Sequence, residues 1–242
     1  MTKSEKRIDG RGVEELRPIT AKVGVLKKAI GSAYFKLGST SAIAGVFGPR
    51  VVHPKHAEEA EKAILRTKYN MAPFSTTTRN RPGHSRRGIE ISMVTRESLS
   101  SAIFLEEFPK TAIDVHIEIL QADASTRCVG INAAALALAD AGVPMRDIVV
   151  SCSAGKVDGK IVLDVAGKED TEGDLDCAIA YYLKRKELTL LQMDGLATTD
   201  EIKEIIKLAV KGCEDLHKKS IEALKQKYSQ ETFSKSGKKE GE

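Results

Sequence analysis

Residues 111–144 read TAIDVHIEILQADASTRCVGINAAALALADAGVP, and this stretch decides the fold class. Its first ten residues alternate in polarity, which predicts a β-strand. From about residue 124 to 141 half of the side chains are alanine or leucine, and few are charged, which predicts a helix that is buried on most sides. We expect Asp123 to cap this helix and Gly142 to end it, with a proline just beyond. A strand therefore leads directly into a buried helix.

The residues before this stretch predict a cluster of strands and one further helix. Three β-rich runs between residues 22 and 52 are separated by glycine-bearing turns, as in a meander. A charged excursion over residues 53–64 interrupts them, and residues 65–74 resume an alternating strand. A polar loop then leads to Ser85, which is expected to cap a helix that runs to about Phe108. The first ten or so residues are charged, and we expect them to be mobile.

The residues after the buried helix predict four more strands and a long helix. Asp158-Gly159 is a strong hairpin signal between the first two of these strands. Thr198 or Thr199 is expected to cap an amphipathic helix that continues to about Tyr228.

The predicted elements define the class and the domain organisation. Strand clusters alternate with long helices, and no βαβ repeat is regular enough for a doubly wound sheet, so the class is α+β. We place one domain at residues 1–147 and a related one at residues 148–228. A polar tail over residues 229–242 is expected to be disordered.

Composition excludes several classes of protein. The chain has 242 residues, of which 41% are hydrophobic and 30% charged, with a net charge of +4. The four cysteines lack the close spacing of a zinc or redox motif, so we expect buried free thiols in a reducing compartment. The start of the chain does not resemble a signal peptide, and the longest apolar run is far shorter than the ~20 residues that span a bilayer. A soluble cytoplasmic protein with no membrane partner is expected.

Both central helices begin with arginine, which is unusual. The first turn of a helix is electropositive and disfavours basic side chains. Ser85-Arg86-Arg87 opens one helix, and Asp123 to Arg127 opens the other. Arginine beside free backbone N–H groups makes a phosphate site. The alternative, in which these arginines reach solvent or an acidic neighbour, stays open.

The run Glu169 to Asp176 places five carboxylates within eight residues. Such a run is commonly a solvated turn, and it does not fit the calcium loop of an EF-hand. However, it leads directly into an apolar strand, so we expect Asp176 to be drawn toward the interior. A buried carboxylate beside an anion site can hold Mg²⁺ or act as a general acid.

Basic side chains also gather in the excursion and in the polar loop that follows the next strand. Glutamates among them favour a solvated face, and RNA binding through the backbone charge is only weakly indicated. The basic residues concerned are Arg50, His53, Lys55, His56, Lys62, Arg66, Lys68, Arg79 and Arg81.

Several motifs together resemble one family. RIDGRGVEELRPI, GPR with HPKH, APFS, SRRGIEIS, FPKTAIDVHIEILQADASTR, AALALADAGVPMRD and EDTEGDLD occur in the order typical of RNase PH-like phosphorolytic 3′→5′ exoribonucleases. The leader and the FPKTAIDV segment are most similar to the catalytic ring subunit of archaeal exosomes. The resemblance covers residues 7 to 228, nearly the whole chain.

This resemblance implies an architecture and a set of partners. The expected fold is RNase PH-like, with two related halves, mixed sheets and packed helices. The expected assembly is a hexameric ring, a trimer of heterodimers with a catalytically inactive paralogous subunit. Single-stranded RNA 3′ ends would enter its pore, and S1/KH-type RNA-binding proteins would cap the ring.

The resemblance also assigns roles to residues. Asp170 and Asp176 match the acidic pair implicated in metal binding and acid catalysis. Many relatives carry glycine at the position of Ser125, which puts phosphate affinity in question, and often glutamate at that of Asp174. The phosphate-binding set implied is Arg87, Ser125, Thr126 and Arg127, and the RNA-facing set is Arg86, Lys55, Lys62, Arg66 and Lys68.

The implied reaction uses inorganic phosphate as the attacking group and Mg²⁺ or Mn²⁺ as the metal. It releases nucleoside diphosphates and can run backwards to tail RNA. As an exonuclease the chain would be grouped broadly with nucleases and hydrolases. One alternative is a homohexameric RNase PH that trims tRNA 3′ ends. The other is a non-enzymatic RNA-binding ring subunit, which should lack Asp170, Asp176 or Arg87, and all three are present.

Overall fold

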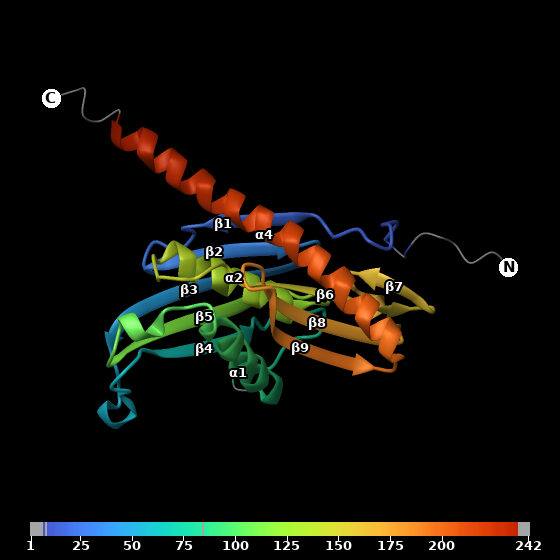
Figure 1. The fold of residues 1–242 in the computed structure, drawn as a ribbon, viewed down its shortest axis with the longest axis horizontal. Helices are drawn as coiled ribbons and strands as arrows, with labels where there is room; N and C mark the ends of the chain where they lie inside the picture. The colour runs from blue at the N-terminus through green and yellow to red at the C-terminus, as the bar shows by residue number, and fades with distance from the viewer. Residues whose placement is uncertain (1–6, 8, 84, 237–242) are drawn as a thin grey trace.

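A computed structural model of the chain describes residues 7, 9–83 and 85–236. Figure 1 shows two sheets with helices packed between and across them. Five strands form the first sheet, in the order β1-β2-β3-β5-β4. Its members are β1 (Ile19–Val23), β2 (Gly31–Leu37), β3 (Thr40–Val51), β5 (Thr111–Gln121) and β4 (Ile64–Met71). The β4–β5 pair is parallel and the other pairs are antiparallel, so this sheet is mixed.

The second sheet has four strands, in the order β7-β6-β8-β9, and is antiparallel throughout. Its members are β6 (Val150–Val157), β7 (Lys160–Leu163), β8 (Leu175–Tyr182) and β9 (Glu187–Gly195). Asp158 and Gly159, between β6 and β7, both have positive φ angles, of 51° and 73°. Two such residues are what a type I′ turn requires, so the hairpin prediction is confirmed.

Four α-helices complete the fold: α1 (Arg86–Ser100), α2 (Thr126–Asp140), the short α3 (Lys168–Glu172) and α4 (Thr199–Ser236). Short 3₁₀ turns lie at Lys55–Ala57 (η1) and Leu105–Glu107 (η2). Figure 1 shows α4 running diagonally across the molecule, and it contacts β1 in one sheet and β6 in the other. The α+β class is confirmed.

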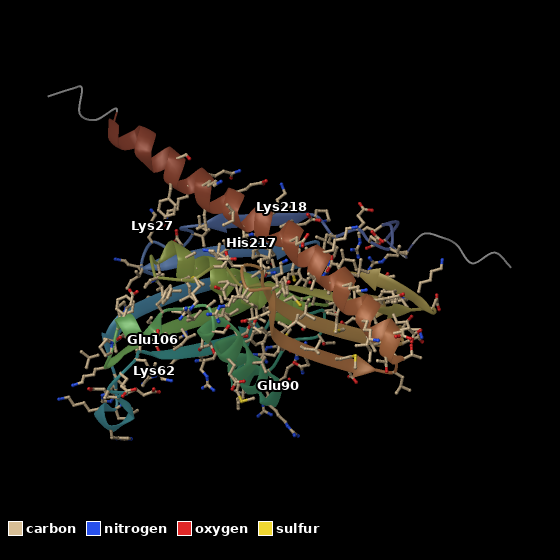
Figure 2. All side chains as sticks on the ribbon, viewed as in Figure 1. Lys27, Lys62, Glu90, Glu106, His217 and Lys218 are labelled. Carbon is tan, nitrogen blue, oxygen red and sulfur yellow. The ribbon has the colours of Figure 1, made fainter. Side chains whose placement is uncertain are left out.

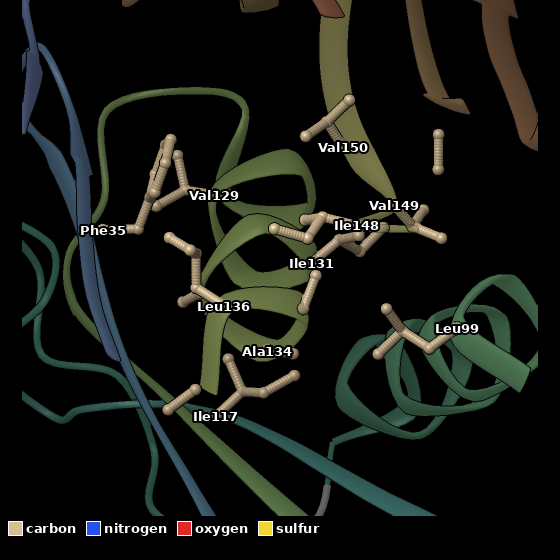
Figure 3. Packing of buried hydrophobic residues seen from close by; sticks show 14 of the residues in the cluster. Phe35, Leu99, Ile117, Val129, Ile131, Ala134, Leu136, Ile148, Val149 and Val150 are labelled. Carbon is tan, nitrogen blue, oxygen red and sulfur yellow. The ribbon is translucent and has the colours of Figure 1, made fainter. Parts of the chain in front are cut away.

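Helix α2 is the centre of the hydrophobic core. It contacts β2, β3 and β5 in the first sheet and β6 in the second. In Figure 3, Val129 and Leu136 face Phe35, whereas Ile131 faces Ile148 on the other side of the helix. Burying each such side chain stabilises the fold by ~1.5–3 kcal/mol. A helix with apolar residues on all sides can join two sheets, as the predicted Ala/Leu-rich helix does here.

Helix α1 is shorter than predicted. It ends at Ser100, and the chain as far as Phe108 forms turns and η2 instead. The backbone of Phe104 donates to Pro144, and that of Arg146 donates to Ala102. Hydrogen bonds to a distant segment therefore replace the next helical turn.

The start of α2 also differs from the prediction. Asp123 does not cap the helix, since the N-cap position is Ser125. Ala124 and Ser125 both adopt left-handed backbone angles, with φ of 62° and 53°, and these turn the chain sharply before Thr126. Such angles are costly for side chains other than glycine and require support from neighbouring structure.

Two predictions about the ends of the chain need correction. Arg7 was expected to lie in a mobile leader, but its side chain is only 4% exposed and pairs with Glu169. Residues 1–6 and 8 lie outside the described residues. Helix α4 continues past Tyr228 to Ser236, so the tail predicted from residue 229 begins inside a helix, and residues 237–242 also lie outside the described part.

Two predictions drawn from composition can be compared with the structure. All four cysteines are buried free thiols, as expected. Within the described part of the chain, no helix combines the length and apolar character needed to cross a bilayer.

Candidate active site

A cleft of about 650 Å³ lies between the starts of α1 and α2 and the strands β8 and β9, with α3 at its side. Helices α1 and α2, which pack on the first sheet, supply its positively charged side chains, and α3 and β8 supply carboxylates. The side chains lining it include Arg87, Glu90, Arg127, Asp170, Asp176 and Gln192. Four predicted site residues, two arginines and two aspartates, are thus brought together from distant parts of the sequence.

The two arginine-bearing helix starts meet at this cleft. Ser85 caps α1 as predicted, because its side chain accepts a hydrogen bond of 2.9 Å from the backbone of Gly88. Arg87 lies in the first turn, and its Nη2 is 3.4 Å from the hydroxyl of Thr126 at the start of α2. The two helix N-termini and their arginines therefore face one site, as an anion requires.

Arg127 has an acidic neighbour that the sequence prediction missed. Its Nη2 lies 3.5 Å from Oε1 of Glu90, a long contact, and the same oxygen accepts a 2.7 Å hydrogen bond from Gln192. Within the described residues, Nε of Arg127 is buried and has no hydrogen-bond partner. The Arg127 side chain is 17% exposed and lines the cleft, so it can contact an anion there. Glu90 was detectable in the sequence, since it is one helical turn after Arg87.

Ser125 and Thr126 take supporting positions. The hydroxyl of Ser125 is 2.9 Å from the carbonyl oxygen of Val165 and 2.8 Å from the hydroxyl of Ser153. Thr126 is buried and accepts from Arg87. Neither is among the described residues that line the cleft. The Ser125 hydroxyl is thus bound within the protein, by Ser153 and Val165.

The carboxylates have altered acidity. Burial, and after it the charge of Asp170, raise the pKa of Asp176 to about 6, although Arg127 opposes this effect. Burial also raises the pKa of Asp170, against the opposing charges of Arg87, Arg17 and Arg127. Asp176 lies directly opposite Asp194 on β9, which further disfavours its charge. A carboxyl group with a pKa near neutrality can transfer protons at physiological pH.

The acidic group suits a divalent cation that is shared with substrate. Within the described residues, no three His, Cys, Asp or Glu side chains are arranged as a complete metal site. Mg²⁺ commonly binds one or two carboxylates and takes its other ligands from water and substrate phosphates. Asp170 and Asp176, which repel each other's charge, fit that donor set.

The predicted RNA-facing residues lie outside the cleft, on α1, on β4, in η1 and in the segment between η1 and β4. Arg86 is exposed beside the cleft, and Lys68 lies further along β4 next to the start of α1. Arg66 donates to the backbone of His53, at 3.1 Å, and Lys62 pairs with Glu59 at 3.5 Å. Lys55 lies in η1. In Figure 2, Lys62 is near one end of the molecule, well separated from Glu90.

Comparison with known proteins assigns the family. The profile of the 3′ exoribonuclease family, domain 1, matches residues 15–144, and that of domain 2 matches residues 147–212. The chain belongs to the 3′ exoribonuclease family. It is 56% identical over 223 residues to the exosome complex component Rrp41 of Pyrococcus furiosus, covering 92% of this chain and 89% of the relative. Rrp41 of Methanopyrus kandleri is 53% identical over 222 residues, covering 92% and 93%.

Solved structures agree with this assignment. The rice Rrp46 structure superimposes with a TM-score of 0.79 at 23% identity, covering 88% of this exoribonuclease and 98% of that chain, which supports the fold alone. An Archaeoglobus fulgidus exosome with RNA bound to the active site matches with a TM-score of 0.77 at 25% identity, covering 88% and 92%.

Family membership settles the class of reaction. The family consists of phosphorolytic 3′→5′ exoribonucleases, so this chain is one, with inorganic phosphate as its co-substrate. Because phosphate and not water breaks the phosphodiester bond, the broad grouping with hydrolases is wrong.

Proposed function

We propose that this chain is the active subunit of an exosome ring, where it shortens RNA from the 3′ end by phosphorolysis. The proposal rests on one observation: arginines and aspartates line the same cleft. Arg87 and Arg127 stand at two helix N-termini, and Asp170 and Asp176, whose pKa values are raised, lie in the same cleft. The cleft can thus bind the attacking anion and also protonate the leaving group.

The arginines bring two anions together. Inorganic phosphate must approach a phosphodiester that is itself negatively charged, and the repulsion requires a cationic environment. Arg87, Arg127 and the N–H groups at the start of α2 hold the attacking phosphate. Its oxygen forms a bond to the terminal phosphorus as the bond to the preceding 3′-oxygen breaks, which releases a nucleoside diphosphate.

The leaving 3′-oxygen needs a proton. Asp176 retains a proton in a fraction of molecules near neutral pH, because its pKa is about 6. It therefore acts as the general acid for the 3′-oxygen. Asp170 and Asp176 would also hold Mg²⁺ or Mn²⁺, which when bound offsets the charge on the RNA phosphate.

The assembly is proposed from the relatives. Rrp41 of Pyrococcus furiosus is named an exosome component, and the Archaeoglobus fulgidus exosome contains RNA at its active site. We place this chain in a hexameric ring with an inactive paralogous subunit, capped by S1/KH-type RNA-binding proteins, in the cytoplasm. Lys55, Lys62, Arg66 and Lys68, outside the cleft, would contact RNA that approaches it, and Arg86 would contact RNA at its rim.

The decisive experiment follows the product. A 3′-tailed RNA is incubated with the full chain, with and without inorganic phosphate, and the released mononucleotides are separated. We expect diphosphates that appear only with phosphate. Monophosphates released in phosphate-free buffer would indicate hydrolysis and contradict the proposal.

A second experiment separates the exosome from the homohexameric RNase PH alternative, which the relatives do not favour. The chain is sized and assayed alone and after mixing with the inactive paralogous subunit. We expect a feebly active chain whose activity rises sharply when the ring forms. A homohexamer that is indifferent to the partner would support the RNase PH that trims tRNA.

A further inference from the structure

Asp164 is a fully buried carboxylate that the proposed reaction does not use. It follows β7 and has a left-handed φ of 56°. An unpaired charge at such a site would be strongly destabilising. Arg17 compensates it with a two-pronged ion pair: Nε to Oδ2 at 2.8 Å and Nη2 to Oδ1 at 2.6 Å. The backbone N–H of Arg17 adds a third bond of 2.8 Å.

Arg17 also binds the loop before α2. Its remaining nitrogen, Nη1, donates to the carbonyl oxygen of Asp123 at 2.7 Å. That carbonyl immediately precedes Ala124 and Ser125, the two residues with left-handed backbone angles that set the start of α2. One guanidinium therefore joins the loop that leads to Arg127 and the segment that leads to the acidic residues.

A second bond joins the same two segments. The hydroxyl of Ser125 lies 2.9 Å from the carbonyl oxygen of Val165, the residue after Asp164. Neither Val165 nor Ser125 belongs to the lining of the cleft in the described chain. The hydrogen bonds from Arg17 to Asp123 and from Ser125 to Val165 therefore link the two segments, and neither places a reactive group in the cleft.

The far end of the acidic segment is also held. Arg7 pairs with the buried carboxylate of Glu169 through Nε at 2.9 Å and also through Nη2. Glu169 in turn accepts from the backbone of Ala166 at 3.1 Å. Asp170 follows directly. The segment from Asp164 to Glu169 is therefore tied at both ends before the chain reaches the cleft.

We infer that Arg17 is a positioning residue, which sets the separation between the phosphate-binding start of α2 and the carboxylate-bearing segment by binding Asp164 and the Asp123 carbonyl at once. The inference rests on the proposed roles of Arg127 and Asp170. A displacement of about 1 Å between reacting groups can cost about a hundredfold in rate. Lysine at this position keeps the charge but cannot span both partners, because it is a point charge without a planar fork.

The test compares Arg17→Lys with Arg11→Lys in the full chain, assembled with its ring partner. Arg11 also contacts Asp164, with Nη1 3.2 Å from Oδ2. Its other bonds go to Asp9, Glu15 and the Asp164 carbonyl, and the described structure gives it no hydrogen bond to residues 123–127. Arg11→Lys is therefore a matched control, because it weakens the ion pair with Asp164 but removes no hydrogen bond to residues 123–127.

We expect Arg17→Lys to lower kcat/KM for phosphate at least about tenfold, while the Kd for RNA stays within about twofold of wild type. Arg11→Lys should leave kcat/KM for phosphate within about twofold at a similar loss of melting temperature. Equal effects of the two variants, or a melting change without a kinetic change, would overturn the inference. A wild-type chain without phosphate-dependent cleavage would instead refute the proposed function.

If Arg17→Lys does not fold, the Ser125–Val165 hydrogen bond is tested in its place. Ser125→Ala removes the hydroxyl that binds Val165 and leaves the backbone of α2 intact. A fall of about threefold in kcat/KM for phosphate, with unchanged RNA affinity, supports the inference that bonds between these two segments position the site. An unchanged kcat/KM for phosphate overturns it.

Discussion

The half of the chain that contains the first sheet supplies the arginines of the cleft, with Glu90 between them, whereas the charged residues that the second half supplies are carboxylates. Arg87 and Arg127 stand on helices packed against the five-stranded sheet, whereas Asp170 and Asp176 belong to the segment and strand of the four-stranded sheet. On each side one residue is exposed, Arg87 or Asp170, and the other, Arg127 or Asp176, is partly buried. Desolvation raises the pKa values of both aspartates, and it raises that of Asp176 most. Phosphate capture and proton transfer are thus separate tasks in separate halves, and each can be perturbed alone.

The largest expected effect comes from removing the acid. Asp176→Ala should lower kcat about a thousandfold, an increase in the barrier of ~4 kcal/mol, because the leaving 3′-oxygen loses its proton donor. RNA affinity should remain within about twofold. Single-turnover phosphorolysis and an RNA filter-binding assay measure the two quantities. A variant that kept more than about a tenth of the wild-type rate would remove Asp176 from catalysis.

A smaller effect is expected on stability. The pKa of Asp176 is raised from 3.8 to about 6, so the folded state binds more protons than the unfolded state between these values. Stability therefore falls as pH rises through that window, and the cost is fully present above pH ~6. Asp176→Asn should stabilise the metal-free chain by up to about 3 kcal/mol at pH 8 and have little effect at pH 3.5.

Thermal unfolding in chelator at the two pH values tests this prediction, with Asp174→Asn as the control, since Asp174 is an exposed carboxylate in the same run. An equal gain for both variants, or a gain of equal size at both pH values, would show that desolvation of Asp176 is not the cause.

The smallest expected effect is on the cationic side. Arg87→Ala should raise KM for phosphate about tenfold, worth ~1.4 kcal/mol, because Arg127 and the helix N-termini still attract the anion. Arg96→Ala is the matched control, since Arg96 lies on the same helix and pairs only weakly with Glu97, at 3.6 Å. Initial rates at varied phosphate concentration give both constants. If the two variants behaved alike, the effect would reflect net charge and not the site.

Local patterns predicted much of this molecule because they depend on neighbours in the sequence. The Ser85 cap, the Asp158-Gly159 hairpin and the buried Ala/Leu-rich helix each follow from a few adjacent residues. The gathering of Arg87, Arg127, Asp170 and Asp176 was expected from the family resemblance, and the structure places all four on one cleft. The spacing of one helical turn places Glu90 near Arg87 on α1, but its contacts with Arg127 and Gln192 depend on the tertiary structure.

The sequence by itself determined the class of fold and the order of the main strands and long helices, since these follow from periodicity and turn residues. Only the tertiary structure decided where α1 stops, how α2 begins, and that Arg7 and Arg17 are buried rather than mobile or solvated. The physical reason is separation along the chain. Arg17 and Asp164 are far apart in sequence, and each compensates the buried charge of the other only because the fold brings them together, which no local pattern encodes.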